Sequence, residues 1–210
     1  DQVIAGRKVS ESETYFRVMV DAVPVIVWMS NTELHYTYLN KNWPAYTGQA
    51  LEKSLGSGWL DAVHTDDVER IIAVFADANS NGRPFTANYR LRDFKGNYRW
   101  VNISGSPRFD SSATYEGMIG TVVDVHEQVE AEETVRSNEE RLKLLIDESP
   151  MRITLLTGPD HVIQIANEQI LKSWGKNKNI IGKPIVEAIP EIKDQPFLQI
   201  LREIYDTGIP

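Results

Sequence analysis

The sequence contains no cysteine among its 210 residues. This absence excludes disulfides, thiolate zinc sites, iron–sulfur clusters and any chemistry that depends on a cysteine nucleophile. Long apolar runs are also missing, because the longest, residues 23–29, falls far short of the ~20 residues that span a bilayer. No signal peptide opens the chain. We therefore expect a cytoplasmic protein without direct membrane contact, although a parent protein could carry membrane segments outside this sequence.

Basic residues are in the minority. Lys and Arg total 22 against 30 for Asp and Glu, which gives a net charge of −8 and a pI near 5.1. Sequence-independent binding to nucleic acid or anionic lipid needs a cationic face, so we expect neither as a partner. Hydrophobic residues at 41% and charged residues at 25% are typical of a folded globular chain.

Motifs of the common enzyme classes are missing as well. The chain has no GxxxxGK[ST] phosphate loop, no GxGxxG after a strand and no GxSxG nucleophile elbow. The pair His126-Glu127 superficially resembles the phospho-accepting pair of a histidine kinase, but QVE follows it instead of a basic residue and Thr/Asn-Pro. The four histidines are His35, His64, His126 and His161. They show no i, i+4 pairing, so we expect no metal site. Because the motifs of the common enzyme classes are missing, we expect no enzymatic activity in this chain.

An internal repeat organises the sequence. Residues 1–24 align without a gap on residues 127–150, and seven positions are identical. After one inserted residue, Asn40 aligns with Asn167, and near the end residues 82–84 align with 208–210. A repeat of this length is a whole domain with its entry helix.

The repeat predicts the domain boundaries. We expect residues 1–10 to end an upstream linker helix, residues 11–125 to form one complete domain and residues 126–147 to form a linker helix. We expect residues 148–210 to be a second copy, truncated before its last three strands.

The periodicity of the complete copy predicts an α+β domain with an antiparallel sheet. Helical spacing covers residues 12–22, and Asp66 and Glu69 have the spacing of a capping box before a longer helix. Strands are expected at residues 25–28, 35–40, 85–92, 98–107 and 115–125. Asp66-Asp67 is interpreted as a helix-capping pair in preference to a catalytic acid pair.

Three segments of this copy resemble a PAS domain with its C-terminal PAC segment: GWLDAVHTDD (58–67), YRLRDFKGNYRWV (89–101) and GMIGTVVDVHEQ (117–128). In the second copy, GPDHVIQIANEQILKSWG (158–175) and IIGKPIVEAIPEI (180–192) resemble a PAS subgroup common in bacterial sensor histidine kinases. The resemblance covers essentially the whole chain. It implies a five-stranded antiparallel sheet whose helix-covered face can hold a ligand or cofactor.

The resemblance also limits the cofactors. Flavin adduct photochemistry in PAS domains needs a cysteine, which this chain lacks. Haem-binding PAS domains use a histidine on the central helix, here residues 66–80, which contain none, and His64 just before it is interpreted as a hydrogen-bonding corner residue. We therefore predict no cofactor, while flavin without adduct chemistry or an unknown small metabolite stays open.

Six residues are predicted to line the space between sheet and helices. They are Trp28, Tyr46, Trp59, Phe75, Tyr89 and Asn102. Aromatic residues at such positions also form packed cores, so a ligand pocket and a filled core are both open.

The connector carries a heptad seam. Its members are Gln128, Ala131, Val135, Asn138, Leu142 and Leu145. Such a seam is typical of a two-stranded coiled coil, and in PAS sensors these helices pair between protomers, although a solvated single helix is the alternative. Asp124 matches the Asp of the family's Asp-x-Thr hinge, and His126 stands where the Thr would be. We predict that Asp124, His126 and the seam residues Val135, Asn138, Leu142 and Leu145 transmit the signal.

Together these observations predict a sensory, signal-transducing PAS module of a bacterial two-component sensor histidine kinase. It would pair with a second copy through the linker helix and act on a C-terminal kinase or other output domain. Two alternatives remain in the same class: an input module of a cyclic-dinucleotide cyclase or phosphodiesterase, and a PAS-fold interaction domain without a ligand. A freestanding enzyme is the alternative in another class, but it has no identifiable nucleophile, base or metal.

Overall fold

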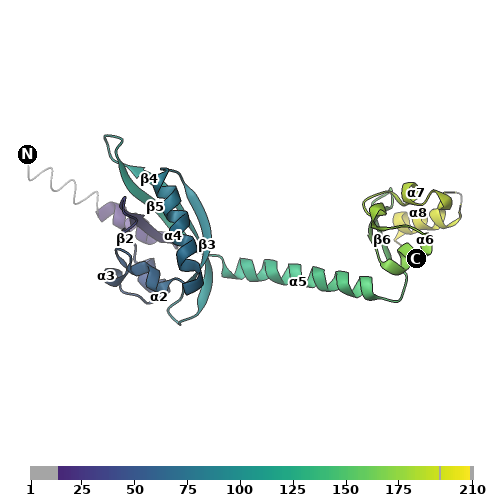
Figure 1. Ribbon diagram of the computed structural model, residues 1–210, viewed down its shortest axis with the longest axis horizontal. Coiled ribbons are helices and arrows are strands. Elements are labelled where there is room, and N and C mark those ends of the chain that lie inside the picture. The colour runs from purple at the N-terminus through teal and green to yellow at the C-terminus, as the bar shows by residue number, and fades with distance from the viewer. Residues whose placement is uncertain (1–13, 194, 209–210) are drawn as a thin grey trace, which may run out of the picture. The chain divides into compact units, whose positions relative to one another are not determined.

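The computed structural model describes residues 14–193 and 195–208. The chain divides into two compact units, Asp1–Ala131 and Glu132–Pro210, which are described separately (Figure 1). The expected end of an upstream linker at residues 1–10 lies outside the described residues. No helix in the described ranges has both the length and the apolar composition of a membrane span.

Unit 1 is built on one five-stranded sheet. Its strands are β1 (Ile26–Ser30), β2 (Tyr36–Leu39), β3 (Phe85–Arg92), β4 (Tyr98–Phe109) and β5 (Tyr115–Asp124). Their order is β2-β1-β5-β4-β3, and neighbouring strands pair antiparallel. The α+β fold class and the antiparallel sheet expected from the sequence are therefore confirmed, with strand ends that differ by one or two residues.

Helices cover one face of this sheet. They are α2 (Asn42–Thr47), α3 (Leu51–Ser54), the 3₁₀ turn η1 (Gly58–Ala62) and α4 (Thr65–Ser80), and residues 14–22 form a further helix before β1. Helix α4 buries Ile71, Phe75 and Ala78, which recur at helical spacing. Its exposed positions carry most of its charges.

The capping of α4 differs from the sequence prediction. The N-cap residue is His64, whose Nδ1 accepts the Asp66 backbone N–H at 3.3 Å. Asp66 lies inside the first turn, where its carboxylate contacts Arg90, so it is not free to cap. The prediction of Asp66 as the capping residue is therefore wrong by two positions. Its carboxylate instead accepts a hydrogen bond from Arg90, which lies 24 residues later on β3.

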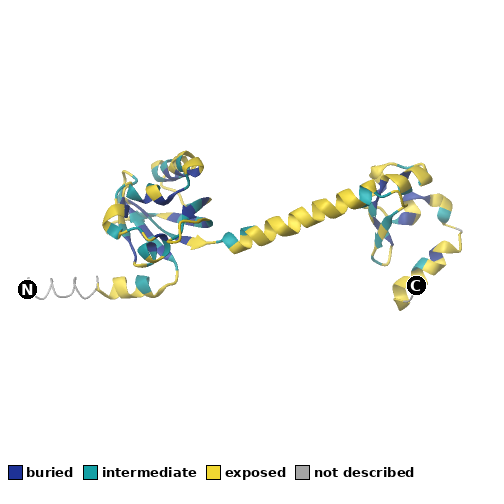
Figure 2. Ribbon diagram, turned by 90° about the horizontal axis from the view of Figure 1, so that it is seen from below, coloured by how far each residue is buried: buried dark blue, intermediate teal, exposed yellow. Residues whose placement is uncertain are grey.

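Aromatic rings fill the space between the sheet and the helices. Trp28 stacks on Tyr36 and Tyr36 on Trp59, with ring centroids 5.1 and 4.7 Å apart, and Phe75 meets Trp28 edge-on. The indole of Trp28 lies over Gly105 and Gly120 of the neighbouring strands. A Cβ at either glycine would approach the indole within 2.9 Å. Buried segments of the ribbon are dark blue in Figure 2, and in unit 1 the buried residues form one hydrophobic core that contains these rings.

Unit 2 repeats the first half of this order on a smaller scale. Strands β6 (Thr154–Thr157) and β7 (Val162–Ala166) form a two-stranded sheet. The short helices α6 (Glu168–Trp174), η2 (Lys178–Ile180), α7 (Ile185–Ala188) and η3 (Pro190–Ile192) follow, and α8 (Phe197–Thr207) comes last. Its core is aliphatic, around Ile163, Leu171 and Ile185.

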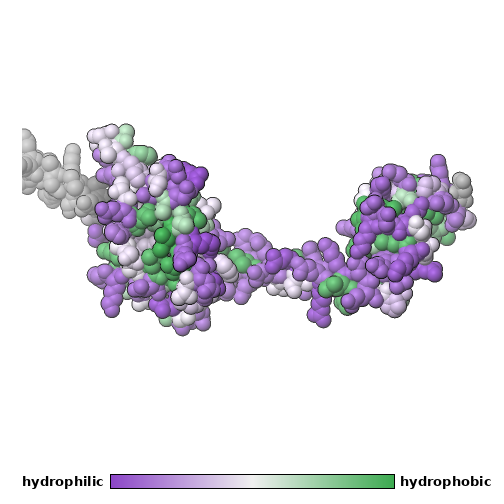
Figure 3. Space-filling model, viewed as in Figure 1, coloured by the Kyte–Doolittle hydropathy of each residue, from purple (hydrophilic) through white to green (hydrophobic). Residues whose placement is uncertain are grey.

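Helix α5 (His126–Glu148) joins the two units. It begins at the residue predicted for the linker and ends one residue later than predicted. None of its residues, all of which the structure describes, is buried. Its polar surface, broken by a few hydrophobic spots, is visible in Figure 3.

Candidate functional site

Asp124 is the last residue of β5, and α5 begins two residues later at His126. Its carboxylate accepts Arg99 Nε at 2.6 Å, the Tyr46 hydroxyl at 2.8 Å and the His126 backbone N–H at 2.9 Å. The antiparallel register places Asp124 opposite Val101, so Arg99, two residues earlier on the same face of β4, reaches it. Asp124 thus connects α2, β4 and the first turn of α5.

The charges of this cluster favour an ionised carboxylate. Partial burial alone would raise the pKa of Asp124, but the Arg99 guanidinium, the His126 N–H and the Tyr46 hydroxyl lower it below its usual value. The hydrogen bond to Asp124 in turn raises the pKa of Arg99. Burial and the neighbouring carboxylate raise the pKa of Tyr46. At neutral pH the cluster therefore holds an anion, a cation and a neutral phenol.

The start of α5 has further contacts with unit 1. The Val125 N–H donates to the Trp100 carbonyl at 3.0 Å, and the Trp100 N–H donates to His126 Nδ1 at 3.5 Å. His126 Nε2 lies 3.3 Å from a carboxylate oxygen of Glu130, one turn further along the helix. His126 thus connects β4 with the first turn of α5.

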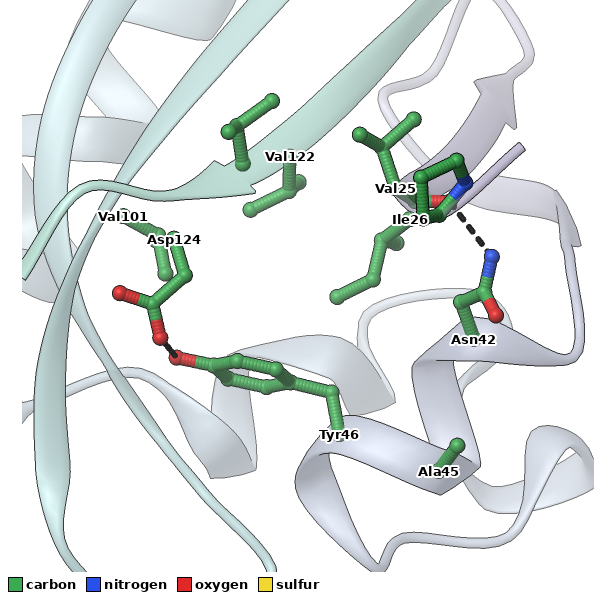
Figure 4. Close-up of a pocket in the computed structure, with 10 residues that line it drawn as sticks. Val25, Ile26, Asn42, Ala45, Tyr46, Val101, Val122 and Asp124 are labelled. Atoms are coloured by element: carbon green, nitrogen blue, oxygen red, sulfur yellow. Dashed lines mark hydrogen bonds between the residues drawn. The ribbon is translucent and has the colours of Figure 1, made fainter.

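A cavity of about 430 Å³ lies beside Asp124 (Figure 4). It is lined by Pro24, Val25, Ile26, Asn42, Ala45, Tyr46, Val101, Val122, Val123 and Asp124. Its walls are mainly apolar, and the Tyr46–Asp124 hydrogen bond and the Asn42 amide are its polar features. The cavity touches the segment that enters the domain before β1 and the end of the strand that leaves it. An occupant would therefore contact both the entry and the exit of unit 1.

The six predicted pocket residues lie in three different places in the structure. Tyr46 lines the cavity beside Asp124. Trp28, Trp59, Phe75 and Tyr89 lie in the closed aromatic core, where each is at most 2% exposed. The indole N–H of Trp28 and the hydroxyl of Tyr89 have no hydrogen-bond partner in the described part of the protein. A ligand contact for these four residues stays a prediction.

Asn102 lies on the other face of the sheet. In β4 the inward residues are Val101 and Ile103, and Asn102 between them points away from the helices. Its amide donates to Asn88 Oδ1 at 2.6 Å and to the Thr86 hydroxyl at 3.1 Å, both on β3. It therefore does not line the space between sheet and helices, because the pleat of β4 directs it outward.

The seam residues predicted for signal transmission remain on the surface of α5. Val135, Leu142 and Leu145 are 58–59% exposed, and Asn138 is exposed as well. Across residues 14–193 and 195–208, no three His, Cys, Asp or Glu residues gather closely enough to hold a metal ion.

Two residues of the site were not predicted from the sequence. Arg99 belongs to the Gly-x-Tyr-Arg-Trp strand, and its inward position in the alternation was the signal that could have paired it with an acid. Asn42 donates its amide to the carbonyls of Val23 and Val25 at 2.7 and 2.8 Å, which no local pattern indicates.

Comparison with known proteins identifies proteins that are similar to this chain. Residues 36–122 match the family model described as the PAS fold. An uncharacterized protein of Sinorhizobium fredii, y4lL, is 37% identical over 123 residues, 59% of this chain and 15% of that protein. The peroxide stress-activated histidine kinase mak1 of Schizosaccharomyces pombe is 27% identical over 223 residues, 92% of this chain and 14% of that protein. The chain thus spans about one seventh of the length of these two relatives.

Among solved structures, an RNA-binding light-oxygen-voltage receptor superposes with a TM-score of 0.50 at 19% identity, covering 61% of this chain and 37% of that one. At this identity the likeness concerns the fold alone. The matched residues 36–122 contain β2, β3, β4 and nearly all of β5, together with α2, α3, η1 and α4. Unit 1 of this chain therefore belongs to the PAS family.

Proposed function

We propose that this chain is a signal-transducing module of a two-component sensor histidine kinase, and that it passes the state of unit 1 into α5 through Asp124. The observation that carries the proposal is that three residues donate to one carboxylate: Tyr46 of α2, Arg99 of β4 and His126 in the first turn of α5. The relationship to a histidine kinase that covers 92% of this chain supports the kinase as output.

The relay follows from the position of the cavity. An occupant that displaces Tyr46 removes one of the donors on Asp124. Hydrogen bonds to a charged group contribute about 1.5–3 kcal/mol each when buried, and less here because the Asp124 side chain is 27% exposed. A change of about 1 kcal/mol at the first turn of α5 is enough to shift a two-state equilibrium roughly fivefold.

The proposal includes pairing of α5 with a second copy of the chain. The seam residues Val135, Leu142 and Leu145 are more than half exposed and recur on alternating three- and four-residue steps. A helix whose apolar positions are exposed gains stability when a partner helix buries them. Asn138 on the same seam favours one register, since a shifted register leaves its amide unpaired.

The test uses the protein that contains this chain at its natural length. We expect ATP-dependent autophosphorylation, and we expect Asp124→Asn and Tyr46→Phe to change its rate at least threefold. Asp61→Asn is the matched control, because Asp61 is exposed on η1, outside the Asp124 cluster. Absence of autophosphorylation would overturn the kinase as output. A rate unchanged in Asp124→Asn would overturn the relay.

A further inference from the structure

Both copies of the repeat hold their incoming helix with an asparagine at the end of the second strand. In unit 1, Asn40 is 1% exposed. Its Oδ1 accepts the Val27 N–H at 3.0 Å, and its Nδ2 donates to the carbonyls of Val25 at 3.0 Å and Val20 at 3.1 Å. Val20 belongs to the helix of residues 14–22. One side chain therefore joins the first strand, the segment before it and the entering helix.

Unit 2 contains the same arrangement. Asn167 is fully buried, its Oδ1 accepts the Ile153 N–H at 3.0 Å, and its Nδ2 donates to Met151 O at 2.8 Å and Ile146 O at 3.0 Å. Each of these three partners is the counterpart, in the aligned repeat, of a partner of Asn40. Asn167 has two further contacts: its Oδ1 also accepts the Ile170 N–H at 3.1 Å and so caps α6, and its Nδ2 lies 3.4 Å from the Ser149 carbonyl oxygen. Ile146 lies in the last turn of α5. Both copies thus share a contact whose three partners lie 13 to 20 residues before Asn40 and 14 to 21 residues before Asn167.

The chemistry of this contact suits asparagine alone among residues of its size. The amide offers one acceptor oxygen and two N–H donors, and both functions are used. Aspartate would place its charge against two carbonyl oxygens, and leucine would leave the N–H of Val27 or Ile153 without its acceptor. The last four carbonyls of a helix have no partner within the helix, so the asparagine also completes the helix end.

We propose that Asn167 is the positioning residue through which α5 acts on unit 2, and that Asn40 does the same for the helix of residues 14–22 in unit 1. The inference rests on the proposed function, in which α5 leaves unit 1 at Asp124. Each copy then has an entry residue, the asparagine, which holds the end of the arriving helix. In unit 1, Asp124 is the corresponding exit residue, which holds the start of the departing helix.

The first measurement is backbone amide hydrogen exchange on the 210-residue chain. Asn167→Ala should speed exchange of residues 145–148 about three- to tenfold, as expected when a net hydrogen bond of about 0.5–1.5 kcal/mol is lost. Asn177→Ala is the matched control, because that exposed asparagine of unit 2 accepts only the nearby Asn179 N–H. Equal exchange at residues 145–148 in wild type and Asn167→Ala would overturn the inference.

The second measurement separates positioning from simple stabilisation. Asp124→Asn should shift the amide NMR signals of residues 126–131 and also those of residues 151–166. In the Asn167→Ala background the first set of shifts should persist and the second should vanish. If both sets of shifts persist in the Asn167→Ala background, the role of Asn167 is overturned but the relay through Asp124 is not. If Asp124→Asn leaves residues 151–166 unchanged even with Asn167 present, the relay itself fails, and the inference fails with it.

Asn40→Ala provides the same test in the larger unit if Asn167→Ala unfolds the smaller one. It should speed exchange in residues 18–22 about three- to tenfold while the amides of β4 and β5 stay protected. Faster exchange throughout unit 1 would indicate a purely structural role and overturn the inference.

Discussion

Replacing Asp67 with asparagine should reduce the acid sensitivity of unit 1. The Asp67 side chain is only 7% exposed, and Oδ2 accepts the backbone N–H of Arg90 at 2.9 Å and its Nε at 2.8 Å. Oδ1 accepts Arg70 Nη2 at 3.2 Å. Burial alone would raise the pKa of this carboxyl, but the bonds from Arg90 and Arg70 outweigh it and lower the pKa to about 2.

The size of the effect follows from that pKa. A fall from 3.8 to about 2 corresponds to roughly 2 kcal/mol of folding free energy, at about 1.4 kcal/mol for each pH unit. The folded pKa is the lower one, so the unfolded chain binds the proton first. The stabilisation is therefore complete above about pH 4 and is lost as the pH falls from about 4 to about 2. The amide introduced by Asp67→Asn cannot ionise, so this variant should lose roughly 2 kcal/mol at pH 7.

Urea unfolding followed by tryptophan fluorescence measures this loss, because four of the five tryptophans belong to unit 1. They are Trp28, Trp43, Trp59 and Trp100, whereas Trp174 belongs to unit 2. Asp66→Asn is the control, since the Asp66 side chain is 71% exposed and has longer contacts, to Arg90 at 3.3 Å and to His64 Nδ1 at 3.6 Å. If Asp67→Asn loses as much stability between pH 5 and pH 2.5 as the wild type does, another group causes the acid sensitivity.

Three further predictions concern the function. We expect the chain to form a dimer through α5 with a Kd of roughly micromolar, and salt should tighten it because it screens the repulsion between the acidic helices. The double variant Val135→Asp/Leu142→Asp should abolish this dimer, because each of the two side chains gains about 1.5–3 kcal/mol from full burial in it. Equal masses for the wild type and the variant in sedimentation equilibrium at every concentration would contradict this. The isolated 210-residue chain should incorporate no phosphate from ATP, and stoichiometric labelling of His126 would refute that expectation. The purified chain should be colourless, and a flavin or Soret band at near-unit occupancy would show a cofactor that we did not predict.

Local patterns account for most of the fold. The alternation in β3 and β4 and the spacing of Ile71 and Phe75 predict elements that the structure places within two residues. The error at the start of α4 has a tertiary cause. Asp66 has the local pattern of a capping residue, but β3 brings Arg90 to its carboxylate, and His64 caps the helix instead.

The site was predicted only in pieces. Tyr46 and Asp124 were assigned to different roles from the sequence, and their hydrogen bond joins residues 78 positions apart. The alternation of β4 indicates that Arg99 faces inward and needs an acidic partner, but which acid it meets depends on how β4 and β5 pair. The burial of Trp28 and Tyr89 follows from their residue types, whereas the closed packing around them depends on how several rings fit together.

The fit of Trp28 over Gly105 and Gly120 restricts how this family member can diverge. An alanine at Gly120 would place its Cβ 2.7 Å from the indole and 1.8 Å from the Ser104 carbonyl oxygen. A smaller residue at Trp28 alone would instead leave a void beneath Tyr36 and Phe75. At Gly105 the nearest atoms belong to side chains, those of Phe85 and Trp28, whereas the atom nearest to a Cβ at Gly120 belongs to the backbone of Ser104. In an alignment of homologues, a side chain at 105 should therefore accompany a small residue at 28, and position 120 should stay glycine whatever residue occupies 28.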